Sequence, residues 1–147
     1  MVAVKSLSGK RLYLDANVFI YTLESLAPWA EQSQALLRMV DEGACFGITS
    51  ELTLAECLVR PLQLKQFENA KLYRQAIQSS THMEATPIRR DILIRAAEIR
   101  SVHNLKLPDA IHLATAQISN CTALLTNDQQ LAACFGKEAI LVSELSL

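Results

Sequence analysis

Short apolar runs alternate with longer segments of helical periodicity along this chain of 147 residues. The first run, LYL at 12–14, contains no charged position, which is typical of a strand buried on both faces of a parallel sheet. Similar runs follow at 45–49 (CFGIT), 122–126 (TALLT) and 139–142 (AILV), with a weaker one at 82–87 (HMEATP). Each of these five runs is predicted to form a strand.

The segments between the runs predict helices. Their approximate bounds are 16–26, 28–42, 51–61, 62–80, 88–103 and 109–118, with a short helix after 128. Pro28 suits the first turn of its helix, Gly43 is well placed to stop that helix, and Pro61 is expected to end or kink the next one. Strands that alternate with helices indicate a parallel α/β sandwich. No composition shift or repeat marks a boundary, so we expect a single domain over 1–147, with no role assigned to the first ten residues.

Composition is that of a compact globular protein, with half of the residues hydrophobic and one fifth charged. No apolar run approaches the roughly 20 residues of a membrane span. The N-terminus lacks the continuous apolar region of a signal peptide, so we expect a cytoplasmic protein with no membrane partner. The four cysteines form no CxxC pair, which favours buried free thiols over zinc ligands.

The net charge of −1 argues, taken alone, against nucleic-acid binding. Four acidic side chains complicate this average: Asp15 ends the first predicted strand, and Glu56, Asp109 and Asp128 occupy comparable surroundings later in the chain. If a metal neutralised these four, the remaining acids would be outnumbered by Lys and Arg. Binding to a phosphate backbone is therefore not excluded.

Each acid also has a purely local explanation. Asp15, Asp109 and Asp128 stand at predicted helix starts, where a carboxylate caps free N–H groups and suits the helix dipole. Glu56 lies at the border of the apolar face of its helix, where a charge needs a partner, and Arg60 at i+4 offers a surface ion pair.

The four acids together indicate more than each does singly. Ligands of open α/β sheets bind beyond the carboxyl ends of the strands, where Asp15 is expected. Four carboxylates gathered there cannot all stay ionised unless cations neutralise them. An all-oxygen cluster suits Mg²⁺ or Mn²⁺, and two such ions about 4 Å apart can activate water for phosphodiester cleavage.

Four motifs now carry a resemblance to a known family. They are DANVF at Asp15, TSELTLAE ending at Glu56, LPDAIHLATA around Asp109, and LLTND ending at Asp128. In this order they resemble the four acidic motifs of PIN-domain nucleases, and more narrowly those of VapC-type toxins of toxin–antitoxin pairs. The resemblance covers residues 11–142.

This resemblance implies a three-layer α/β/α fold with a central, mainly parallel sheet, and a metal-dependent endoribonuclease activity. It implies that Asp15, Glu56 and Asp109 bind Mg²⁺ or Mn²⁺, with Asp128 acting directly or through water. Asn17 and the Thr126 hydroxyl would support the carboxylates by hydrogen bonds.

The partners that the resemblance implies are an RNA substrate, a cognate antitoxin that covers the acidic site, and a second copy in a homodimer. RNA as the substrate comes from the resemblance alone, because hydrolysis by an activated water does not require the 2′-hydroxyl.

Other polar residues have weaker claims to a function. Lys106 and Arg60, with Arg89 and Arg90, are candidates for contacts to the phosphate backbone, although a solvated helix face explains them equally simply. His112 follows Asp109 by three residues and is placed to orient it or to reach a phosphate. The alternative for His112 is a half-buried side chain with its hydrogen bonds satisfied.

Two other functions stay open at this point. A dehalogenase-like phosphatase would use the first-strand Asp as a covalent nucleophile, but it needs a second Asp where this chain has Asn17. A noncatalytic module of the same fold, used for binding or assembly, is the second alternative. Loss of an acid would have favoured it, and all four acids are present.

Overall fold

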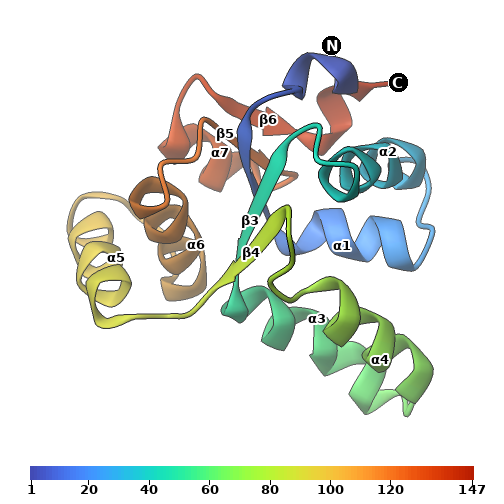
Figure 1. The fold of residues 1–147 in the computed structure, drawn as a ribbon. Helices are drawn as coiled ribbons and strands as arrows, with labels where there is room; N and C mark the ends of the chain where they lie inside the picture. The colour runs from blue at the N-terminus through green and yellow to red at the C-terminus, as the bar shows by residue number, and fades with distance from the viewer.

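A five-stranded parallel sheet with helices on both faces forms the centre of the computed structural model, which describes residues 1–147 (Figure 1). Its strands are β2 (Arg11–Leu14), β3 (Phe46–Ser50), β4 (Met83–Thr86), β5 (Ala123–Thr126) and β6 (Ala139–Leu141). Their order is β4-β3-β2-β5-β6, and every neighbouring pair is parallel. The predicted five-stranded α/β/α architecture is therefore confirmed.

Seven α-helices flank this sheet. They are α1 (Ala16–Leu23), α2 (Ala30–Asp41), α3 (Glu51–Gln63), α4 (Phe67–Ala76), α5 (Arg90–Val102), α6 (Leu107–Ile118) and α7 (Gln129–Phe135). Figure 1 shows α5 and α6 together on one side of the sheet and α1 and α2 on the other. The sheet is thus the middle of three layers.

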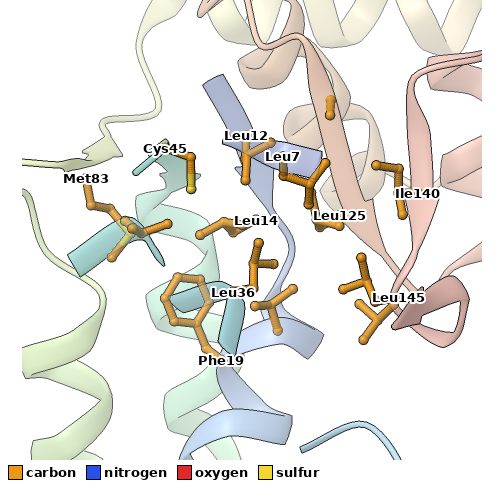
Figure 2. Close-up of a cluster of buried hydrophobic side chains, with 14 of the residues drawn as sticks. Leu7, Leu12, Leu14, Phe19, Leu36, Cys45, Met83, Leu125, Ile140 and Leu145 are labelled. Carbon is orange, nitrogen blue, oxygen red and sulfur yellow. The ribbon is translucent and has the colours of Figure 1, made fainter. Parts of the chain in front are cut away.

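Strand β2 contributes to a separate hydrophobic core on each face of the sheet. Leu12 and Leu14 pack in one cluster with Phe19 and Leu36, as Figure 2 shows. Tyr13 lies between them in sequence and belongs to the other cluster, because successive strand residues point to opposite faces. All three strand residues are fully buried, so the prediction of a strand covered on both sides is confirmed.

The helix boundaries differ from the predicted ones around Pro61. This proline does not end α3, which continues to Gln63. The reason is that Pro61 removes a single N–H near the end of the helix while its ring is buried in the interior. The next helix begins only at Phe67, after a connection in which Lys65 has a left-handed backbone with φ of 55°.

The first ten residues do have a structural role, contrary to the sequence analysis. Strand β1 (Val2–Ala3) pairs in parallel with β7 (Leu145–Ser146), and the two ends of the chain lie near each other (Figure 1). The 3₁₀ turn η1 (Val4–Leu7) buries Leu7 in the same cluster as Leu12 and Leu36, and a second turn, η2 (Val142–Glu144), precedes β7.

Two expectations from composition concern the thiols and the membrane. The four cysteines are free, and burial raises the pKa of Cys45 to about 11. Burial and the nearby charge of Glu56 raise the pKa of Cys57 to about 12. Both thiols therefore stay protonated at neutral pH, and Cys121 and Cys134 are partly exposed.

None of the helices has the length and apolarity needed to cross a bilayer.

The N-terminal turn should contribute measurably to stability. Leu7→Ala removes a side chain that is 1% exposed, and it should lower the free energy of unfolding by about 2–5 kcal/mol in urea titrations. Lys5→Ala, in the same turn but exposed, is the control and should change it little. Equal stabilities of the two variants would contradict the placement of Leu7 in the core.

Candidate metal centre at the carboxyl edge of the sheet

The order of the strands creates a switch point beside β2. From β2 the chain passes to β3 and β4 on one side and later to β5 and β6 on the other. Open α/β sheets bind ligands at the carboxyl ends of the strands at such a point. Asp15 directly follows β2, and Asp128 follows β5 by two residues. Glu56 comes from α3, which follows β3, and Asp109 from the first turn of α6.

Asp15 is fixed by hydrogen bonds to both of its carboxylate oxygens. Oδ1 accepts a bond of 2.8 Å from the backbone N–H of Ala16, so the side chain caps α1. Oδ2 accepts a bond of 2.6 Å from the hydroxyl of Thr126. The residue is 8% exposed. Asp15 therefore caps a helix and also lies at the sheet edge, so the local and the functional explanations apply to the same side chain.

Thr126 connects two of the acids through a single buried oxygen. Its Oγ1 donates to Asp15 and accepts the backbone N–H of Asp128 at 3.0 Å. Asp128 in turn caps α7, because its Oδ1 accepts the N–H groups of Gln130 and Leu131 at 2.9 and 3.1 Å. The Oδ2 atom of Asp128 takes no part in these bonds, which leaves it available to a ligand.

Glu56 is paired with His112 and forms no ion pair with Arg60. Nε2 of His112 lies 2.6 Å from Oε1 of Glu56 and 3.9 Å from Oδ1 of Asp15. Nδ1 of the same ring lies 2.5 Å from the hydroxyl of Tyr13. The His112 side chain is 1% exposed, whereas that of Glu56 is 35% exposed. His112 therefore hydrogen-bonds Glu56, whereas the options considered from the sequence were orienting Asp109, reaching a phosphate, or a half-buried side chain with its hydrogen bonds satisfied.

The pKa shifts reflect the closeness of the acidic side chains. Burial raises the pKa of Asp109, and the charges of Asp128, Asp15 and Glu56 raise it further, while His112 opposes them. Burial lowers the pKa of His112, but the hydrogen bond to Glu56 and the charges of Asp15, Glu56 and Asp109 outweigh it, so the net pKa is raised. The carboxylates thus lie near enough to repel one another.

This donor set fits a hard divalent cation. Ligand atoms of Asp15, Glu56 and His112 lie within 4.8 Å of one another. Asp109 contributes a carboxylate whose ionised form is disfavoured by its neighbours, and a cation would reverse that penalty. The carboxylate oxygens of this cluster are ligands of the kind that Mg²⁺ and Mn²⁺ prefer, whereas Nε2 of His112 is engaged in its hydrogen bond to Glu56.

The side chains of the other candidate residues form no hydrogen bond or ion pair with the acids of this cluster. Asn17 is in the first turn of α1 and makes no side-chain hydrogen bond, so its supporting role stays a prediction. Lys106 is exposed at the N-cap position of α6, three residues before Asp109. Arg60 is exposed on α3, one turn beyond Glu56. Their proposed contacts to a phosphate backbone also stay predictions.

Tyr13 is the residue of the site that the sequence analysis missed. The sequence indicates Tyr13 only as an apolar position of the first strand, and it gives no sign that the Tyr13 hydroxyl meets His112. A usable signal was present, because a buried hydroxyl and a buried imidazole each need a hydrogen-bond partner. The sequence does not show that the Tyr13 hydroxyl and the His112 ring are each other's partners, because that depends on how β2 and α6 pack.

Comparison with known proteins identifies the family. The model of the PIN domain family matches residues 12–134, which is most of the chain, and this protein therefore belongs to the PIN domain family. A comparison with curated proteins finds no match.

Solved structures share this fold. A toxin–antitoxin complex from Klebsiella pneumoniae is 24% identical, with a TM-score of 0.66 and coverage of 89% of this chain and 97% of that one. The sarcin–ricin loop cleaving toxin VapC20 of Mycobacterium tuberculosis is 16% identical, with a TM-score of 0.70 and coverage of 86% and 97%. FitAcB from Neisseria gonorrhoeae is 18% identical, with a TM-score of 0.69 and coverage of 91% and 99%.

The shared hydroxyl of Thr126 should matter for stability. Thr126→Val keeps the shape but leaves Oδ2 of Asp15 and the N–H of Asp128 without this partner, at a cost of about 1–3 kcal/mol in the free energy of unfolding. Thr126→Ser retains the hydroxyl and should lose clearly less. Chemical denaturation of both variants in metal-free buffer measures the difference, and a loss in Thr126→Ser as large as that in Thr126→Val would contradict a stabilising role of the hydroxyl.

The repulsion around Asp109 predicts a stabilising substitution. Burial and the neighbouring carboxylates raise its folded pKa, so stability falls as the pH rises from its unfolded to its folded pKa, and the full penalty applies above the folded pKa. Asp109→Asn should therefore raise the melting temperature of metal-free protein and reduce the further rise on adding Mn²⁺. Glu98→Gln, an exposed acid on α5, is the control. A lower melting temperature for Asp109→Asn without metal would contradict the repulsion.

Proposed function

We propose that this protein is a metal-dependent endoribonuclease of the VapC type, the toxin of a toxin–antitoxin pair. The observation that carries the proposal is the convergence of Asp15, Glu56, Asp109 and Asp128 at the switch point of a PIN-domain sheet. The likeness in fold to a toxin–antitoxin complex and to a sarcin–ricin loop cleaving toxin supports it.

All four acids would take part in binding the metal. Asp15, Glu56 and Asp109 would bind Mg²⁺ or Mn²⁺, and Asp128 would add its Oδ2 directly or through water. A bound ion would supply an activated water and would offset the negative charge that develops on the phosphate. Thr126 keeps Asp15 turned toward the site, since its hydroxyl bonds Oδ2.

The reaction is the hydrolysis of an RNA phosphodiester. The water oxygen forms a bond to phosphorus, the bond from phosphorus to the 3′ oxygen breaks, and that oxygen takes a proton. The products are a 5′-phosphate and a 3′-hydroxyl, and no side chain acts as a nucleophile. Exposed Lys106 and Arg60 would contact the phosphate backbone near the cluster.

The partners follow from the same proposal. An antitoxin would cover the acidic cluster and counter its charge, and a second copy of the chain would complete a homodimer. Side chains on α3 and at the start of α4 offer apolar contact area, because Val59, Leu62 and Phe67 are 54%, 49% and 63% exposed. A cytoplasmic location, where RNA is available, belongs to the same proposal.

The two alternative functions were a dehalogenase-like phosphatase and a noncatalytic binding module. Membership of the PIN domain family leaves no basis for a dehalogenase-like phosphatase. A noncatalytic module of the same fold would keep the architecture without the chemistry, and it is the outcome against which the proposal is tested.

Cleavage of a labelled, structured RNA by the antitoxin-free protein tests the proposal. Cleavage should require Mg²⁺ or Mn²⁺ and stop with EDTA, and Asp15→Asn should reduce it at least about 100-fold because the substitution removes a ligand charge while keeping the shape. Fragments should carry 5′-phosphate and 3′-hydroxyl ends.

Asp41→Asn, an exposed acid at the end of α2, is the matched control and should cleave as the wild type does. Cleavage that survives Asp15→Asn would point to a contaminating nuclease. Absence of cleavage on a panel of RNAs, by protein shown to bind Mn²⁺, would favour the noncatalytic module.

A further inference from the structure

A buried chain of hydrogen bonds runs from the central strand to the most exposed acid of the site. It begins at the hydroxyl of Tyr13 on β2, passes through both ring nitrogens of His112 on α6, and ends at Oε1 of Glu56 on α3. The proposed catalytic acids account for only the last of these three residues. The two bonds span 99 and 56 residues of sequence, so three separate elements are required to build the chain.

We propose that His112, held in place by Tyr13, is a positioning residue that fixes the carboxylate of Glu56 for metal binding. This inference rests on the proposed function, because it assigns a task to the same site. It goes further in naming two residues outside the four acids that determine how tightly the ion is held.

Glu56 needs such an anchor more than Asp15 does. Asp15 has a short side chain with hydrogen bonds to both oxygens, and it is 8% exposed. Glu56 has one more rotatable bond, its side chain is 35% exposed, and its only hydrogen bond is the one from His112. Without that bond the carboxylate would sample several rotamers, and the cation would have to order it.

The direction of the bond to Glu56 does not depend on the protonation of His112. A carboxylate only accepts, so Nε2–H donates to Glu56 in both the neutral and the charged ring. In the neutral ring Nδ1 accepts from the hydroxyl of Tyr13, whose pKa burial raises well above its ordinary value, so the hydroxyl keeps its proton. In the charged ring Nδ1–H donates to the same oxygen.

Tyr13 supplies the rigid end of the chain. It is fully buried on the central strand, and its ring meets that of His112 edge-on, with centroids 5.8 Å apart and planes inclined by 67°. This contact and the 2.5 Å bond to Nδ1 set the ring so that Nε2 faces Glu56. A metal-site carboxylate held by a buried histidine is an outer-shell support of the kind that tunes metal affinity.

The spacing of the atoms favours support over direct ligation by His112. Two donors on one ion, each about 2.1 Å from it and at right angles, lie about 3 Å apart. Nε2 of His112 and Oε1 of Glu56 are 2.6 Å apart, which is the length of a hydrogen bond to a charged acceptor. Nε2 is therefore occupied by the proton that it shares with Glu56.

Calorimetric titration of metal-free protein with Mn²⁺ alone tests the inference without any RNA. His112→Ala should weaken Mn²⁺ binding by about 10- to 100-fold. His112→Gln can place an N–H donor near the position of Nε2 and should recover part of the loss, whereas His112→Asn reaches only toward Tyr13 and should not. His103→Ala, an exposed histidine, is the matched control and should bind as the wild type does.

A double-mutant cycle distinguishes positioning from a general loss of structure. In a Glu56→Gln background, His112→Ala should weaken Mn²⁺ binding little further, because the residue through which it acts is already altered. Tyr13→Phe removes one hydroxyl without changing the shape of the core, and it should weaken Mn²⁺ binding in the same direction as His112→Ala but less. It also serves as the second variant if His112→Ala fails to fold.

The outcomes separate the inference from the function on which it rests. Wild-type binding of Mn²⁺ with unchanged affinity in His112→Ala and Tyr13→Phe would overturn the positioning role alone. Equal losses in the wild-type and Glu56→Gln backgrounds, or nitrogen coupling to bound Mn²⁺ in pulsed electron paramagnetic resonance that disappears in His112→Ala, would also overturn it. Absence of Mn²⁺ binding by the wild type would overturn the proposed metal site and the inference together.

Discussion

Repulsion between carboxylates gathered at one edge of the sheet is the constraint on which the rest of the site depends. The fold brings these acids together at the switch point, and the pKa of Asp109 is raised by its burial first and then by the charges of Asp128 and Asp15. Asp15 and Asp128 gain a local compensation as helix caps. Asp109 lies in the first turn of its helix, where the dipole favours a negative charge, but it caps no N–H group because Lys106 occupies the N-cap position. Gathering these like charges lowers the stability of the fold, as active sites commonly do.

The architecture could be predicted from the sequence because its signals are local. Apolar runs such as LYL at 12–14 separate segments of helical period, and this alternation leaves few topologies open. Strands of two residues carry no such pattern, so the pairing of β1 with β7 went unpredicted. Pro61 predicts the end or a kink of its helix, whereas α3 continues to Gln63 with Pro61 buried, and burial is a property of packing rather than of the nearby sequence.

The candidate site was predictable to a smaller extent than the fold. Three of the acids stand out because each follows a strand or opens a helix, and Glu56 because it lies at the border of the apolar face of its helix. The order of the four motifs also resembles a family. The contact of Tyr13 with His112 and of His112 with Glu56 could not be derived, because it depends on how α6 and α3 lie against β2. Two interpretations of His112 were open: a side chain whose hydrogen bonds are satisfied within the protein, and a functional residue. Both hold, since one of its hydrogen-bond partners, Glu56, is a proposed metal ligand.

The pairing of β1 with β7 joins two segments that lie far apart in the sequence. Val2 and Ala3 pair with Leu145 and Ser146, so this ladder encloses the five-stranded sheet within one long loop of chain. Closing a loop costs chain entropy that grows with the length of the loop, and a ladder of two residues returns little in exchange. The ladder is therefore expected to form after the central sheet and to be among the first pairings lost when the protein opens locally.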